Sequence, residues 1–142
     1  MSSLAGKVAI ITGASSGIGA ATAVHFSRLG AVLAITGRNA ENLAKTAREC
    51  RESGGQEPLI IGADLVKEED CVKIISETVD KFGKLDVLVN NAGVLEMGSI
   101  ENTSLEQYDR VMGTNMRAVY HLTMMAVVYS SLVTATFIDK VG

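Results

Sequence analysis

The chain has 142 residues, a hydrophobic fraction of 47% and a formal net charge of −3, with acidic and basic residues interleaved. A chain of this size is expected to form one domain with its own core, and its charge balance argues against nucleic acid or an anionic membrane as a partner. The two cysteines, Cys50 and Cys71, stand apart from each other and from any histidine pattern, so neither a disulfide nor a metal site is predicted and a cytoplasmic location is favoured.

Short apolar strands alternate with helices along the chain. The strands are expected at residues 7–12, 31–36, 58–65 and 85–93, and the helices between them at residues 17–29, 40–53 and 67–82. The apolar spacing places Val72 and Ile75 on the buried face of the third helix. This alternation predicts an α/β fold of the Rossmann type, built on a doubly wound parallel sheet.

A longer helix is expected to begin after Ser104, which forms a capping-box pattern with Gln107. It runs to about residue 128, with Tyr108 expected on its buried face. Residues 122–138 then carry no charge, which approaches the length of a membrane-spanning segment. Their serines and threonines favour a buried helix end followed by a fifth strand at 132–138, with the membrane span as the alternative.

Residues 12–19 read TGASSGIG and join the first strand to the first helix. In a doubly wound sheet, ligands bind at the carboxyl ends of the strands, and free amides at a helix start bind phosphate groups. Gly13 is expected to permit a tight turn, Gly17 to let a pyrophosphate approach the backbone, and Gly19 to let the helix pack on its strand. The residues predicted around the phosphates are Gly13, Ser15, Ser16, Gly17, Ile18 and Gly19. Because the spacing G-x-x-x-G-x-G differs from the common G-x-G-x-x-G pattern, a purely structural turn is the alternative.

The second strand ends in TGRN, and its Arg38 lies nineteen positions after Gly19. Enzymes that use NAD keep an acidic residue near this position for a ribose hydroxyl, whereas an arginine can bind a 2′-phosphate. The sequence therefore favours NADP(H) over NAD as the bound dinucleotide. A solvated surface arginine is the alternative interpretation.

Together these segments resemble the classical short-chain dehydrogenase/reductase family, and most closely its 3-oxoacyl-carrier-protein reductase-like members, over roughly residues 5–127. The resemblance is carried by TGASSGIG, by ADL at residues 63–65, by NNAG at residues 90–93 and by the long helix that contains Asn115. It implies hydride transfer between a nicotinamide and a carbonyl or alcohol carbon. It also implies places for individual residues: Asp64 and Leu65 beside the adenine, Asn91, Ala92 and Gly93 along the cofactor, and Asn115 near a water of the proton relay.

The tyrosine–lysine pair and the serine that perform the family's chemistry have no counterpart in this sequence. No tyrosine is followed by a lysine four positions later, because Tyr108, Tyr120 and Tyr129 are followed by Met112, Met124 and Val133. The three tyrosines are therefore interpreted as surface or packing residues. We expect residues 1–127 to form an NADP(H)-binding half-domain and residues 128–142 a divergent tail, as a truncated isoform or an incomplete gene sequence would give.

Two functions are left open by the sequence. In the first, the chain is an NADP(H)-dependent oxidoreductase by family that is inactive alone, since it lacks the acid/base group that such chemistry uses. In the second, it is a non-catalytic cofactor-binding or interaction module that forms homo- or hetero-oligomers. The sequence does not identify a substrate, because the family's substrate loop has no counterpart in it.

Overall fold

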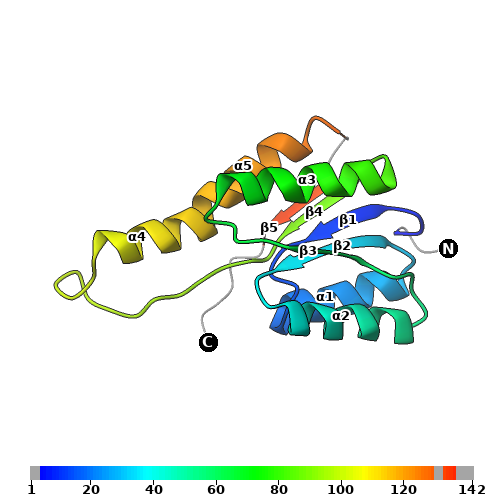
Figure 1. Ribbon diagram of the computed structural model, residues 1–142, viewed down its shortest axis with the longest axis horizontal. Coiled ribbons are helices and arrows are strands. Elements are labelled where there is room, and N and C mark those ends of the chain that lie inside the picture. The colour runs from blue at the N-terminus through cyan, green and yellow to red at the C-terminus, as the bar shows by residue number, and fades with distance from the viewer. Residues whose placement is uncertain (1–3, 130–132, 137–142) are drawn as a thin grey trace.

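The computed structural model describes residues 4–129 and 133–136, in which a parallel sheet lies between two layers of helices (Figure 1). The elements in chain order are β1 Val8–Ile11, α1 Gly17–Arg28, β2 Val32–Gly37, α2 Ala40–Glu52, β3 Leu59–Gly62, α3 Glu68–Phe82, β4 Val87–Asn90, α4 Leu105–Met112, the π-helical turn η1 Gly113–Arg117, α5 Ala118–Ala126 and β5 Val133–Thr136. The expected alternation of strands and helices is therefore confirmed.

The sheet has the strand order β3-β2-β1-β4-β5, and every neighbouring pair is parallel. The order runs outward in one direction from β1 to β3 and in the other from β4 to β5, so it reverses between β1 and β4. In such sheets the crevice at this reversal, outside the carboxyl ends of the strands, is where ligands bind. The predicted Rossmann-type class is confirmed, and β5 lies within the fifth strand expected at 132–138, whose remaining residues fall outside the described ones.

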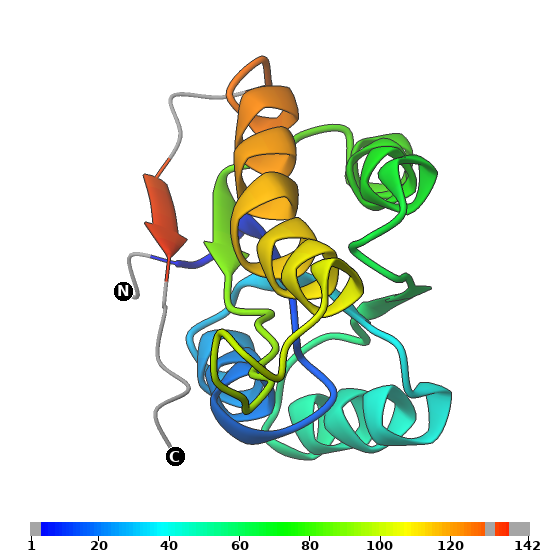
Figure 2. The ribbon, with the colours of Figure 1, turned by 90° about the vertical axis from the view of Figure 1, so that its left-hand side faces the viewer.

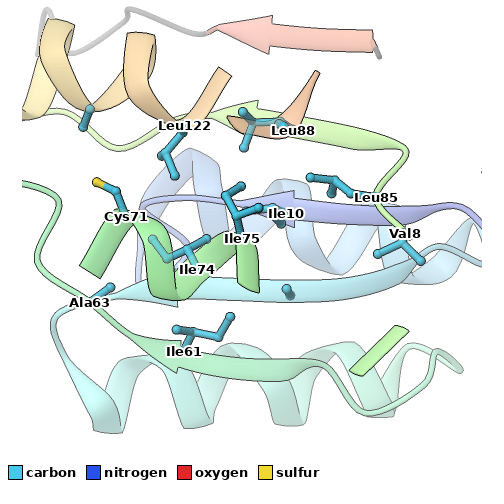
Figure 3. Close-up of a cluster of buried hydrophobic side chains, with 13 residues drawn as sticks. Val8, Ile10, Ile61, Ala63, Cys71, Ile74, Ile75, Leu85, Leu88 and Leu122 are labelled. Atoms are coloured by element: carbon cyan, nitrogen blue, oxygen red, sulfur yellow. The ribbon is translucent and has the colours of Figure 1, made fainter. Parts of the chain in front are cut away.

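Two hydrophobic clusters cover the two faces of the sheet. Figure 2 shows the helices that lie on either side of the sheet. Successive strand residues point to opposite faces, so Ile10 packs toward α3 and α5 while Ile11 packs toward α1 and α2. Figure 3 shows the first cluster, in which Ile74 and Ile75 of α3 and Leu122 of α5 meet the side chains of the strands. Both faces are covered by helices, as the apolar strands of a parallel sheet require.

The buried faces of two helices differ from the predicted ones. In α3 the buried residues are Cys71, Ile74, Ile75 and Thr78, so Ile75 is confirmed, but Val72 is 46% exposed and its predicted burial is wrong. Tyr108 of α4 is 59% exposed, and its predicted burial is also wrong. The helix expected from Ser104 to about residue 128 is real but is interrupted by the π turn η1, and its capping box between Ser104 and Gln107 is present.

Large apolar side chains at every fourth position of α4, η1 and α5 are exposed. This Tyr/Met row consists of Tyr108, Met112, Met116, Tyr120 and Met124. Residues four apart are slightly more than one turn apart in an α-helix, so a row with this spacing drifts around the helix axis. A π turn holds more residues than an α turn, so η1 reverses part of that drift. Among the described residues, no helix has both the length and the apolar character that crossing a membrane requires.

Candidate functional site

The glycine loop between β1 and α1 adopts a conformation that side chains would obstruct. Gly13 and Gly17 both have positive φ angles, +62° and +57°, which are rarely adopted by other residues. A Cβ on Gly13 would lie 2.8 Å from the Cα of Ala92, whereas a Cβ on Gly17 would meet no atom within 4 Å. The close approach of the Ala92 backbone thus leaves no room for a side chain at Gly13, where a tight turn is predicted. The backbone at Gly17, in contrast, borders open space.

The loop after β4 is hydrogen-bonded to the start of the glycine loop. The Asn91 side-chain amide donates to the carbonyls of Thr12 and Gly13 at 3.1 Å each, and the Thr12 hydroxyl accepts from the amides of Asn91 and Ala92. A Cβ on Gly19 would lie 2.1 Å from the Gly13 oxygen and 2.4 Å from the Asn91 amide nitrogen. Gly19 therefore allows α1 to approach the chain directly after β1, where the Asn91 side chain donates to the Thr12 and Gly13 carbonyls. We call this pair of hydrogen bonds the Asn91 brace.

A cleft of about 200 Å³ opens at the carboxyl ends of β1, β2 and β3. It is lined by Gly13, Ser15, Ser16, Thr36, Gly37, Arg38, Ala63, Asp64, Leu65, Ala92, Gly93, Val94 and Thr114. Eight of the predicted site residues are among these, although they come from four separate segments of the sequence. The fold thus brings the glycine loop, the TGRN and ADL segments and the NNAG loop to one place.

The start of α1 leaves its first amides without a partner from the usual capping group. Ser16 occupies the N-cap position, but its side chain makes no capping hydrogen bond, and the first turn holds no acidic residue. The first N–H groups of a helix have no partner within the helix, and with the helix dipole they attract anions. The beginning of α1 can therefore receive a phosphate group at the edge of the cleft.

Arg38 and Asp64 supply the charged groups of the cleft lining. Arg38 is exposed and makes no hydrogen bond or ion pair with any described residue. The Asp64 carboxylate accepts from the Val66 amide at 3.2 Å, while the Asp64 amide donates to the Asp70 carboxylate at 2.8 Å. The guanidinium of Arg38 is thus available to a ligand, and the Asp64 carboxylate is held at the end of β3.

The glycine loop, the uncapped helix start and the unpaired arginine together fit a dinucleotide with a diphosphate. The open space at Gly17 would be filled by a side chain, which explains why glycine is needed where no protein atom comes close. One buried polar atom in the cleft, the Thr36 hydroxyl, has no hydrogen-bond partner among the described residues. The residues present therefore fit a dinucleotide.

Asn115 lies in the π turn η1 and does not line this cleft. Its Oδ1 accepts from the Val94 amide and its Nδ2 donates to the Val94 carbonyl, both at 2.8 Å. The same loop is tied to α4 by Arg110, whose guanidinium donates two hydrogen bonds to the Glu96 carboxylate. These contacts fix the segment that follows the NNAG motif.

No cysteine in the described part of the chain has the character of a nucleophile. Burial raises the pKa of the Cys71 thiol to about 11, and the neighbouring Asp70 adds to the effect. Burial also raises the pKa of Cys50. Since the thiolate is the reactive form, neither side chain is suited to covalent chemistry. The described residues also contain no cluster of three metal-ligating side chains.

The structure places the remaining predicted residues around the cleft rather than in its lining. Gly17 and Ile18 form the exposed start of α1, and Gly19 and Asn91 lie beneath the loop. Of the lining residues that the sequence did not predict, most lie within or next to a quoted motif, such as Ala63 in ADL and Val94 after Gly93. Thr114 is different, because it comes from the distant η1, and its only signal is its place next to Asn115.

Comparisons with known proteins agree with this geometry. The family profile described as short chain dehydrogenase matches residues 7–133. The chain is 37% identical over 127 residues to 11-beta-hydroxysteroid dehydrogenase A of Sesamum indicum, covering 89% of this chain and 36% of that protein. Across the curated relatives that it matches, the chain spans 36–47% of their length.

Two solved structures show the same fold with a bound dinucleotide. A short chain dehydrogenase from Burkholderia cenocepacia in complex with NADP has a TM-score of 0.86 at 32% identity, covering 92% of this chain and 55% of that one. The NADH-dependent reductase A1-R′ complexed with NAD has a TM-score of 0.82 at 37% identity, covering 89% of this chain and 53% of that one.

Proposed function

Because the chain belongs to the short-chain dehydrogenase/reductase family, we propose that it binds a nicotinamide dinucleotide in the cleft at the carboxyl ends of β1, β2 and β3. One observation carries the proposal: at Gly17 the backbone has a φ of +57° and borders open space, beside a helix start without a side-chain cap. A diphosphate supplies the acceptors that these amides lack. Relatives solved with NADP and with NAD support this class of ligand.

We further propose that NADP(H) is bound in preference to NAD(H). Arg38 follows the end of β2, lines the cleft and has no partner among the described residues. A guanidinium can form paired, charge-assisted hydrogen bonds with a 2′-phosphate. No carboxylate stands at this position to accept from a ribose 2′-hydroxyl, as an NAD-binding site of this fold would have.

The experiment is a calorimetric titration of the chain with NADPH and with NADH, repeated for Arg38→Asp. Loss of one charge-assisted contact predicts NADPH binding about tenfold or more weaker, with a smaller change for NADH. Arg48→Asp is the matched control, since Arg48 is an exposed arginine on α2 that does not line the cleft. Equal losses for both dinucleotides would remove the 2′-phosphate assignment, and no heat with either would remove the site.

We infer that the 142-residue chain binds the cofactor without turning it over at enzymatic rates. Bound nicotinamide supplies hydride transfer to or from a carbonyl or alcohol carbon, and the oxygen of that group needs a proton donor. The sequence holds no tyrosine with a lysine four residues on, and general acid/base groups commonly contribute about 10²–10⁴-fold. Oxidation of NADPH in the presence of a small 3-oxoester, followed by absorbance, should therefore stay near the uncatalysed rate.

A second candidate function, self-association, is favoured by the exposed Tyr/Met row. In an antiparallel pair of copies with a two-fold axis at Met116, Met112 would face Tyr120 of the second copy and Tyr108 would face Met124. Each pairing is a contact between a sulfur and an aromatic ring, and a two-fold interface requires such self-complementarity. Contiguous exposed apolar rows of this kind mark interfaces more often than free surface.

Sedimentation velocity tests this association directly. The chain is expected to sediment as a dimer at tens of micromolar, and Tyr120→Glu, which removes a side chain that is 74% exposed, is expected to sediment as a monomer. Val72→Glu on α3 is the control, because Val72 is exposed and apolar but lies outside the row. A monomeric wild-type chain would contradict the second function and leave the cofactor site untouched.

A further inference from the structure

Thr36 carries a buried hydroxyl that nothing in the described chain satisfies. It is the penultimate residue of β2 and is 1% exposed, yet its Oγ1 has no hydrogen-bond partner. Only its backbone is engaged, since the Thr36 carbonyl accepts from the Ala14 amide at 3.0 Å. Buried polar side-chain atoms in native proteins nearly always have a partner, so each exception calls for an explanation.

The other deeply buried threonines show what a purely structural role looks like. The hydroxyls of Thr12, Thr46 and Thr78 each donate to a backbone carbonyl, at 3.4, 2.9 and 2.7 Å. In each case the side chain joins two parts of the fold or two turns of a helix. Thr36 makes no such contact, and a valine has the same shape, so the folded chain alone gives no reason for a hydroxyl at this position.

The position of Thr36 supplies the reason, because Thr36 is among the residues that line the candidate cleft. Side chains alternate along β2, so Thr36 shares a sheet face with Ala34, which packs in the cluster under α3 and α5. The cleft residues from β3 and its exit, Ala63 and Leu65, are apolar. An unsatisfied hydroxyl in a cleft that also has apolar lining residues suits a heterocyclic or sugar group that offers hydrogen-bond acceptors.

We propose that the Thr36 hydroxyl donates a hydrogen bond to the adenosine half of the bound dinucleotide and is thereby a further binding residue of the cleft. This inference rests on the proposed function, since it assigns an atom within the same cleft. Thr36 lies two residues before Arg38, the group assigned to the 2′-phosphate of that half. The diphosphate has its own donors at the glycine loop and the start of α1, which leaves the nucleoside as the partner of Thr36.

The test compares Thr36→Val with Thr36→Ser in calorimetric titrations with NADPH and with its fragment 2′-phospho-AMP. Removal of one neutral hydrogen bond predicts that Thr36→Val binds both ligands about threefold to tenfold more weakly. Thr36→Ser keeps the hydroxyl and should bind within about twofold of the wild type. Thr78→Val, a buried threonine outside the cleft, is the matched control and should bind both ligands as the wild type does.

Urea unfolding of the ligand-free proteins separates this role from a structural one. Because the hydroxyl has no partner in the free chain, Thr36→Val should be at least as stable as the wild type while binding more weakly. A structural hydroxyl would give the reverse pattern, with lower stability and unchanged affinity, and that result would overturn the inference. Weaker binding of NADPH by Thr36→Val with unchanged binding of 2′-phospho-AMP would also overturn it, by moving the contact to the other half of the dinucleotide.

The outcome for the wild type keeps the two proposals distinguishable. If the wild type binds NADPH and Thr36→Val binds it equally well, the Thr36 inference fails while the proposed function stands. If the wild type binds neither NADPH nor 2′-phospho-AMP, the proposed function fails and the inference that depends on it fails too.

Discussion

Replacing Gly19 by alanine sets two physical effects of opposite sign against each other. Gly19 lies inside α1, where alanine is favoured over glycine by about 1 kcal/mol on helix propensity alone. The added Cβ, however, would lie 2.1 Å from the Gly13 carbonyl oxygen and 2.4 Å from the Asn91 amide nitrogen. Relief requires the loop or the helix to move by about 1 Å, since such a contact normally needs more than about 3 Å.

The free-energy cost of that movement is the sum of two contributions. Overpacking of a rigid interior costs about 1–3 kcal/mol, and pulling Gly13 from the Asn91 side chain, now at 3.1 Å, forfeits a hydrogen bond of about 1 kcal/mol. After the gain of about 1 kcal/mol in propensity, the free energy of unfolding should fall by roughly 1–3 kcal/mol. Steric contact with the Asn91 brace thus predicts that Gly19→Ala lowers the free energy of unfolding, whereas helix propensity alone predicts that it raises the free energy of unfolding.

Urea denaturation followed by circular dichroism measures this difference, with Gly17→Ala and Gly83→Ala as controls. Both control positions have positive φ, and a Cβ at either of them would meet no atom within 4 Å, so each substitution should cost only the left-handed strain of about 1 kcal/mol. Gly17→Ala should in addition weaken NADPH binding, because its Cβ enters the proposed phosphate site, whereas Gly83→Ala should not. An unchanged or raised stability of Gly19→Ala would refute the brace at Asn91.

Three further predictions concern groups outside the cleft. Burial raises the pKa of the Asp86 carboxyl, but hydrogen bonds from the Val8 amide and the Lys84 ammonium outweigh it and leave that pKa below its ordinary value. Its stabilisation is therefore present above pH about 4 and lost below it, and stability curves of wild type and Asp86→Asn should converge on acidification. Cys71, whose pKa burial raises to about 11, should react slowly with a thiol reagent at pH 8 until urea unfolds the chain. Ser104→Ala should remove the capping box and destabilise the first turn of α4 by about 1 kcal/mol, seen as faster amide hydrogen exchange there.

The fold was predictable from the sequence because its signals are local. Each apolar run is short, and glycines or caps separate it from the next helix, so the alternation alone selects a parallel doubly wound sheet. The face of a helix is a weaker signal when small or polar residues are buried. In α3 the buried line includes Thr78, whose hydroxyl is satisfied by the Ile74 carbonyl at 2.7 Å, and a count of apolar residues shifts the predicted face to Val72.

The helix from Ser104 onward shows a second limit of the same kind. Its buried line is made of Thr114, Ala118, Leu122 and Ala126, three of which are small. The larger apolar residues, such as Tyr108, lie on the outside instead. A regular α-helical period cannot recover this arrangement, because the π turn η1 changes the rotation between the two halves of the helix.

The candidate site was predictable where a motif carries it and not where the fold alone does. The glycine loop and Arg38 are recognisable because positive φ angles and an unpaired cation demand particular residue types. Thr36 and Thr114 reach the cleft only because the end of β2 and the start of η1 lie beside it. A threonine is ordinary in a strand or helix, so neither position is distinctive before the elements are assembled.

The contacts of Asn115 support a positioning role for its side chain in this chain. The resemblance implies a water of the proton relay, yet the Asn115 amide group holds both the N–H and the carbonyl of Val94 at 2.8 Å. Val94 directly follows Gly93 and itself lines the cleft, so the clamp fixes one wall of the proposed cofactor site. Asn115 makes both contacts from within the π turn η1. We therefore infer that Asn115 is a positioning residue for dinucleotide binding, a role that requires no acid/base partner elsewhere in the chain.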